Sequence, residues 1–343
     1  MDRNMSEVEK EVQVEKKKKK MRINRQKIAP YAFISPFFII FALFMIFPLG
    51  FSIFVSFQKW SGTGMQNIQF TGLKNFLFLL FEDIYFWKTI RITIWLLIFG
   101  SLSQHAFAIP LAILLNNKFL KGREIFRTAY FLPVITSSVS VAIIFQNVFN
   151  MKYGLLNFIT GLLNIPPVDW VNWSWSIPIA IAIVINWRWI GWNTLIYLAG
   201  LQSIPHELYE SADIDGASLI TKHVNITIPM LLPIIFFAVT MSIIGGMQIF
   251  DEPFVLTQGY LWMGGTDNAG FTAAFYILWS LQRAGRLGRS NAIAWLLFVF
   301  VLIMTFINRA ITNYYQGDRR MKRIKNPGKP ESDSAYDPQV SLH

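Results

Sequence analysis

The stretch IPHELYESADIDGASLITKHVNITIPMLLP, residues 204–233, stands between two long apolar segments and is nevertheless acidic. Its carboxylates are those of Glu207, Glu210, Asp213 and Asp215, and its one fixed positive charge is Lys222. Short loops of membrane proteins that face the cytoplasm are usually basic. Something other than contact with lipid has therefore shaped this stretch.

The local sequence predicts how this stretch folds. Ser203 is a residue type that caps a helix start, Pro205 suits a first turn, and the carboxylates suit the positive end of the helix dipole. Gly216 can end the helix because glycine takes the left-handed conformation without steric penalty. We predict a short surface helix, a sharp turn, and a second segment that enters the membrane near Pro229 and Pro233.

The rest of the chain predicts an all-α integral membrane protein. Of its 343 residues, 53% are hydrophobic. They come in runs of about 20 residues or more, which is the length that spans a bilayer. We predict six transmembrane helices, over residues 31–57, 89–115, 129–149, 177–201, 228–250 and 291–312.

The distribution of positive charge predicts the orientation. The net charge is +11, and most lysines and arginines lie in residues 1–28, in the loop at 118–127 and after residue 315. The positive-inside rule places these segments, both termini and the acidic loop in the cytoplasm. We expect the tails 1–28 and 316–343 to be disordered. Because their charge lies beside apolar spans, we expect them to contact the lipid bilayer and no nucleic acid.

Three connections are expected on the external side, residues 60–83, 153–176 and 251–289, of which the last is the longest. Its stretch 271–281 is apolar and aromatic but too short to cross a bilayer. We predict a surface or re-entrant helix there.

The sequence lacks the residues and motifs that several kinds of chemistry require. There is no cysteine, no GxxxxGK[ST] phosphate loop, and the four histidines have no metal-ligand spacing. We therefore predict no catalytic residue, no metal site and no cofactor bound by this chain.

The predicted spans contain polar groups that could line a pathway. Arg188 and His105 are ionisable. An ionisable residue inside a membrane either has a functional role, facing a cavity or a charged partner, or makes a structural hydrogen bond between helices. Tryptophan planes beside hydrogen-bonding groups can hold a sugar, although they are equally common in helix packing. The candidate pathway residues are Arg188, Trp187, Trp192, Asn193, Gln146 and Gln248.

The acidic stretch also resembles a known motif. It is similar to the EAA motif of ABC importer permeases, with the order Glu210-Ser211-Ala212, three residues, Gly216, nine residues and then Ile226-Thr227-Ile228-Pro229. Ser211 stands in place of an alanine of the motif and Ile228 in place of a leucine. The stretches FRTAYFLPVITSSVSVAIIFQNVFN from Phe126 and NWRWIGWNTLIYLAG from Asn186 resemble the carbohydrate branch of binding-protein-dependent permeases, of the maltose and glycerol-phosphate type. Residues 258–272 depart from that family's pattern.

The resemblance implies a sugar-importing permease subunit in the cell membrane. In that family the motif helix docks on a separate cytoplasmic ATPase. Carried over by position, the coupling residues are Glu207, Glu210, Ser211, Ala212, Asp213, Asp215 and Gly216. The implied partners are a second permease, as a heterodimer, two copies of the ATPase, which uses ATP and magnesium, and an extracytoplasmic solute-binding protein.

Two other classes of function remain open. A secondary transporter or channel for a small solute would account for six spans and an intramembrane arginine, but not for an acidic, glycine-terminated cytoplasmic helix. A membrane-embedded enzyme would need clustered catalytic groups, which the sequence lacks.

Overall fold

The protein is described by a computed structural model over residues 30–62, 64, 68–117, 121–257, 263–282 and 286–325, with side chains to residue 314. Most of the two tails for which we predict disorder lies outside these residues. The described part of the C-terminal tail corrects one boundary, because helix α15 (Leu287–Lys325) continues past residue 316. Arginine, lysine and methionine favour helix here, and Pro327 follows in the sequence.

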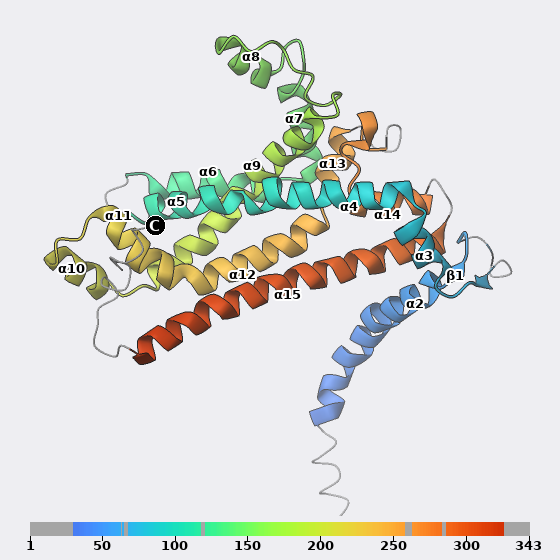
Figure 1. Ribbon diagram of the computed structural model, residues 1–343, viewed down its shortest axis with the longest axis horizontal. Helices are drawn as coiled ribbons and strands as arrows, with labels where there is room; N and C mark the ends of the chain where they lie inside the picture. The colour runs from blue at the N-terminus through green and yellow to red at the C-terminus, as the bar shows by residue number, and fades with distance from the viewer. Residues whose placement is uncertain are drawn as a thin grey trace, which may run out of the picture.

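The described residues are mostly helical and confirm the predicted all-α class. Within the part of the chain that the structure describes, five helices are long and apolar enough to cross a membrane, and a sixth span results if one bent pair is counted as one. The five are Pro30–Ser56, Ile84–Asn116, Ser176–Gln202, Leu219–Met247 and Leu287–Tyr314. Figure 1 shows the last four running side by side, whereas the first diverges from the bundle.

The named elements are shorter pieces of these spans and the connections between them. The first of the five spans contains η1 (Ala42–Ile46) and α2 (Phe47–Ser56), and the second contains α4 (Ile84–Leu96), η3 (Leu97–Leu102) and α5 (Gln104–Asn116). The third is α9 (Ser176–Gln202). The fourth contains α11 (Leu219–Lys222), η4 (His223–Thr227) and α12 (Ile228–Met247). The connections contain β1 (Gln58–Lys59), β2 (Gln69–Phe70), α3 (Lys74–Phe81), α8 (Leu155–Leu162), α10 (Glu207–Ile214), α13 (Asp251–Leu256), η6 (Thr266–Asn268) and α14 (Ala273–Gln282).

The second span begins earlier than the predicted residue 89. Asp83 caps α4, and its carboxylate accepts hydrogen bonds from the backbone N–H groups of Tyr85 and Phe86, at 2.8 and 3.2 Å. Lys88 and Arg91 dilute the hydropathy of this first part, so a hydropathy window alone places the start too late.

The third predicted span, 129–149, is broken in the structure. It consists of α6 (Arg123–Ile135) and α7 (Ser138–Val148), which are bent by 102° relative to each other. Pro133 has no N–H to donate within α6, and Thr136 at the break has extended backbone. The hydroxyl of Thr136 donates to the carbonyl of Leu132 at 2.9 Å, which satisfies one of the carbonyls freed where α6 ends.

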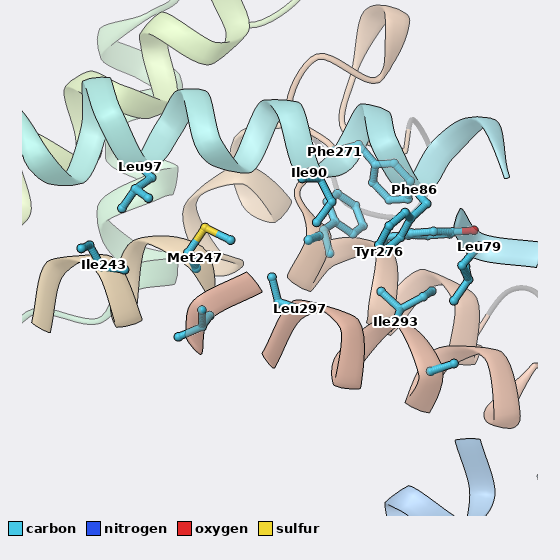
Figure 2. Packing of buried hydrophobic residues seen from close by; sticks show 14 residues of the cluster. Leu79, Phe86, Ile90, Leu97, Ile243, Met247, Phe271, Tyr276, Ile293 and Leu297 are labelled. Atoms are coloured by element: carbon cyan, nitrogen blue, oxygen red, sulfur yellow. The ribbon is translucent and has the colours of Figure 1, made fainter. Parts of the chain in front are cut away.

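The segment 271–281 contains a helix, α14 (Ala273–Gln282), but side chains of the segment are buried in the core and do not lie on a surface. Phe271, Phe275 and Tyr276 are buried in a cluster with residues of α4, α12 and α15. Figure 2 shows Phe86, Ile90, Tyr276 and Ile293 pointing toward one another. The Tyr276 hydroxyl donates a hydrogen bond to the Asp83 carboxylate. Burial, and to a smaller extent this hydrogen bond, raise the pKa of Tyr276, so the phenol stays protonated.

Glycines allow helices to approach closely within the bundle. A Cβ on Gly191 of α9 would lie 1.8 Å from the backbone oxygen of Tyr130 in α6, and a Cβ on Gly100 would lie 2.9 Å from Ile185 Cδ1. Small residues at such crossings are typical of membrane helix packing. The position of α9 against its neighbours, and so the site below, depends on them.

Candidate functional site

A cavity of about 370 Å³ lies between α9, the junction of η3 with α5, the end of α12 and the start of α13. Four of the predicted pathway residues line it together, namely Arg188, Trp192, Asn193 and Gln248. Arg188 with Trp192, and Trp189 with Asn193, are four residues apart on α9 and therefore share one face of the helix. Gln248 arrives from the C-terminal end of α12.

Arg188 is paired, and its partner is a residue that the sequence alone did not single out. Its Nη1 atom donates to Glu252 Oε1 at 2.8 Å, and the two side chains are 13% and 5% exposed. Its Nη2 atom donates to the Thr136 carbonyl at 3.4 Å, and its guanidinium lies 5.5 Å from the ring centroid of Trp189. Arg188 therefore joins α9 to α13 and to the break between α6 and α7.

The neighbouring acid, Asp251, also lines the cavity. Its Oδ2 accepts a hydrogen bond from the hydroxyl of Ser138 at 2.6 Å, in the first residue of α7. The sequence signal for these two acids is their adjacency in the run Phe250-Asp-Glu-Pro, directly after the fifth span. With Arg188 as the one basic residue among the lining residues, the cavity wall is slightly acidic.

The remaining wall combines aromatic planes with neutral hydrogen-bonding groups. Trp189, Trp192 and Phe250 supply the planes, and Ser101, Gln104, Asn193, Ser242 and Gln248 supply the polar groups. The Gln104 side chain donates to the Ser101 carbonyl at 2.5 Å, while its Oε1 atom is buried and accepts no hydrogen bond from the described residues. An acceptor left open beside a cavity can receive a hydroxyl from a bound molecule.

The structure places two predicted pathway residues elsewhere. Gln146 Nε2 donates to the carbonyl of Val255 at 2.7 Å and so joins α7 to α13. The ring of Trp187 lies edge-on to Phe145, with centroids 5.2 Å apart, and is nearly half exposed. Trp187 lies on another face of α9 because it precedes Trp192 by five residues, which is not a whole number of turns.

His105 takes the structural alternative. Its Nδ1 atom and the Tyr197 hydroxyl are 2.7 Å apart, and both side chains are buried between α5 and α9. This hydrogen bond joins the second span to the fourth.

The acidic stretch follows the C-terminal end of α9 and forms the predicted short helix, α10 (Figure 1). Gly216 has φ +71°, and backbone bonds from Gly216 N to Asp213 O (3.1 Å) and from Ala217 N to Ala212 O (2.9 Å) close the helix end. The prediction for Ser203 is wrong: it ends α9, where its hydroxyl donates to the Gly200 carbonyl at 2.7 Å, and His206 occupies the N-cap of α10. Ser203 is taken up by α9 because that helix extends to Gln202.

Two contacts hold α10 against the bundle. The Tyr209 hydroxyl lies 2.9 Å from the Thr227 hydroxyl, and Lys222 is paired with Asp213. The outer face of this region remains exposed. It comprises Glu207, Glu210, Ser211, Asp213, Ile214, Asp215 and Gly216, with Ala212 partly buried. Ile214 is 88% exposed although it is apolar.

Known proteins resemble this chain over most of its length. Residues 108–319 match the family model for the binding-protein-dependent transport system inner membrane component. The arabinooligosaccharides transport system permease protein AraP of Bacillus subtilis (strain 168) is 35% identical over 298 residues, which are 85% of this chain and 91% of that protein. The lactose transport system permease protein LacF of Rhizobium radiobacter is 34% identical over 250 residues, 72% of this chain and 81% of that protein.

The fold has a counterpart among solved structures. A bacterial ABC transporter involved in the import of the acidic polysaccharide alginate contains a chain that superposes with a TM-score of 0.71, at 21% identity, over 86% of this chain and 99% of that one. This likeness concerns the fold alone. The family match and the identity to AraP go further: the chain is an integral membrane transport component and belongs to the family of inner membrane components of binding-protein-dependent transport systems.

Proposed function

We propose that the chain is a permease subunit of an ATP-driven importer and forms half of the pathway for a sugar or oligosaccharide. The observation that carries this proposal is the cavity beside Arg188, where tryptophan planes stand next to open amide and hydroxyl groups. Sugars need both, because their ring faces are apolar and their hydroxyls require hydrogen-bond partners.

The charges of the cavity favour a neutral sugar. The one guanidinium there, that of Arg188, is already paired with Glu252, and Asp251 adds a further carboxylate. Among the described residues of the wall, an acidic sugar would meet no free positive charge. The names of similar permeases agree, since they refer to arabinooligosaccharides, lactose and trehalose/maltose.

The energy comes from other chains in this proposal. The sequence has no phosphate loop, so ATP and Mg²⁺ are bound by two copies of a separate cytoplasmic ATPase. The exposed acids of α10 and Ile214 form its docking surface, with Gly216 holding the helix end in place. A second, different permease completes the pathway, and an extracytoplasmic solute-binding protein delivers the sugar.

Coupling then follows from the shape of the chain. α10 lies at one end of α9, and the cavity lies along the same helix. Movement of the ATPases would act on α10 and be carried by α9 and α12 to the cavity, where it would shift the equilibrium between outward-open and inward-open states.

The test is gentle detergent extraction of the full-length chain from its native membrane, followed by identification of the proteins that co-purify. We expect an ATPase and a second permease in a fixed ratio. A homo-oligomer without an ATPase would contradict the proposal and favour a secondary transporter or channel.

A further inference from the structure

A second cavity, of about 790 Å³, lies between β1, β2, α3 and the first turn of α15. Figure 1 shows these elements at the end of the bundle opposite α10. The cavity beside Arg188 shares no lining residue with it. The sugar pathway therefore leaves its residues without a role.

The charge of this cavity is positive. Lys59, Lys74, Arg286 and Arg289 line it, against one carboxylate, that of Glu82. Within the described residues, none of the four cations has an ion pair or a side-chain hydrogen bond. The carboxylates of Glu82 and Asp83 act on the charge of Arg289, but the four cations outnumber them, and an excess of positive groups attracts a bound anion.

Arg289 shows this most clearly. Its guanidinium carbon lies 3.8 Å from the ring centroid of Phe78, which holds the side chain in place by a cation–π contact. Its Nε atom is buried and has no hydrogen-bond partner. A buried donor without a partner is costly, and an anion in the cavity would offer oxygen atoms to the guanidinium.

The cavity also lies at the depth of a membrane surface. Three apolar spans end around it, because Pro30–Ser56 stops just before Gln58, Ile84–Asn116 starts just after Glu82, and Leu287–Tyr314 starts beside Arg286. The hydrocarbon region of a bilayer ends where such spans end. The cavity therefore faces the headgroup layer of the membrane.

A row of exposed apolar side chains continues from the cavity along α3. It consists of Leu73, Leu77 and Phe81, which recur at helical spacing over α3 and its N-cap, and of Ile84, the first residue of α4; Leu77 also lines the cavity. A positive hollow joined to an exposed apolar row matches a molecule with an anionic head and apolar chains.

We propose that this cavity binds the phosphate headgroup of an anionic phospholipid, whose acyl chains lie along the row from Leu73 to Ile84. The phosphate sits between the lysines and the two arginines, and α3 lies in the membrane surface. An acidic extracytoplasmic protein is the competing occupant. Such a protein would pair with the cations, but it would not contact the apolar row that faces the lipid.

The experiment is lipid titration of the purified full-length complex followed by native mass spectrometry, with phosphatidylglycerol compared with phosphatidylcholine. The variant is Lys59→Gln/Lys74→Gln, because both lysines are exposed and their replacement leaves the core intact. We expect phosphatidylglycerol to bind more tightly than phosphatidylcholine, and the double variant to weaken it about 25-fold, at about fivefold for each basic side chain. The matched control, Lys152→Gln, removes an exposed lysine between α7 and α8 and leaves the affinity unchanged.

Three results would overturn the proposal. One is equal affinity for the two lipids. Another is unchanged phosphatidylglycerol binding in the double variant; if that variant instead loses its extracytoplasmic binding protein, the cavity is a docking site for that protein. The third is displacement of the lipid by an equal concentration of soluble glycerol 1-phosphate, which would make the cavity a site for free phosphate compounds.

Discussion

Arg188 of α9 and Glu252 of α13 form an ion pair, with 2.8 Å between Nη1 and Oε1, in the wall of the cavity proposed to hold the sugar. They are far apart in sequence and come from two elements that the pair ties together. The same arginine contacts the carbonyl of Thr136, at the break between α6 and α7. One side chain thus joins α9 and α13, which line the cavity, to the break between α6 and α7.

We predict that Glu252→Gln destabilises the protein by about 3 kcal/mol, because it leaves the guanidinium of Arg188 partly buried without a counter-charge. Thermal unfolding of the purified chain, followed by fluorescence-detected size exclusion, measures the effect. Asp251→Asn is the matched control, since among the described residues its carboxylate has only the Ser138 hydroxyl as partner. Equal stability of Glu252→Gln and wild type would mean that the pair does not hold α13.

A second prediction concerns the aromatic wall. Trp192→Ala should raise the KM for sugar uptake about fivefold, the equivalent of about 1 kcal/mol of lost ring contact. Trp187→Ala removes the same side chain from the same helix but outside the cavity, so uptake should keep its KM. If the two variants changed the KM equally in a transport assay, the cavity would not be part of the sugar pathway.

The helix end at Gly216 gives a third prediction. A Cβ there meets nothing within 4 Å, but φ is +71°, so Gly216→Val strains the backbone by about 1–2 kcal/mol and deforms the turn. We expect normal membrane insertion and loss of the co-purifying ATPase. Gly161→Ala in α8 is the control, because that position is also open and its φ is not positive. Unchanged ATPase recovery with Gly216→Val would contradict the coupling role of α10.

Packing between α6 and α9 gives a fourth prediction. Gly191→Ala places a methyl group 1.8 Å from the Tyr130 carbonyl oxygen, so the helices must separate, at a cost of about 1–3 kcal/mol. A lower unfolding temperature in detergent is the expected result. Gly50→Ala is the control, since nothing lies within 4 Å of the added Cβ. Similar unfolding temperatures for both variants would show that the crossing can relax.

Much of the fold follows from hydropathy and local capping rules. The lengths of the apolar runs predict the spans, and Gly216 predicts the end of α10, because both depend on residues close together in sequence. The bend of 102° between α6 and α7 does not follow in this way. A hydropathy window averages over Pro133 and Thr136 and reports one continuous span.

The candidate site was predictable in part for a similar reason. Arg188, Trp192 and Asn193 share a helix face, so their spacing brings them together. The contribution of Glu252 depends on how α13 folds back against α9, which no local pattern encodes. The polarity of Gln146 predicts a place in the pathway, but its side chain donates a hydrogen bond to the Val255 carbonyl.

The most direct test of the central claim is uptake of a labelled neutral oligosaccharide into proteoliposomes that contain the purified complex, with its extracytoplasmic binding protein outside. ATP inside the vesicles should be required for uptake, and an ion gradient alone should not replace it. An acidic oligosaccharide of the same length should be a poor substrate. Uptake that proceeds without ATP, driven by a gradient of solute or ions, would contradict the account.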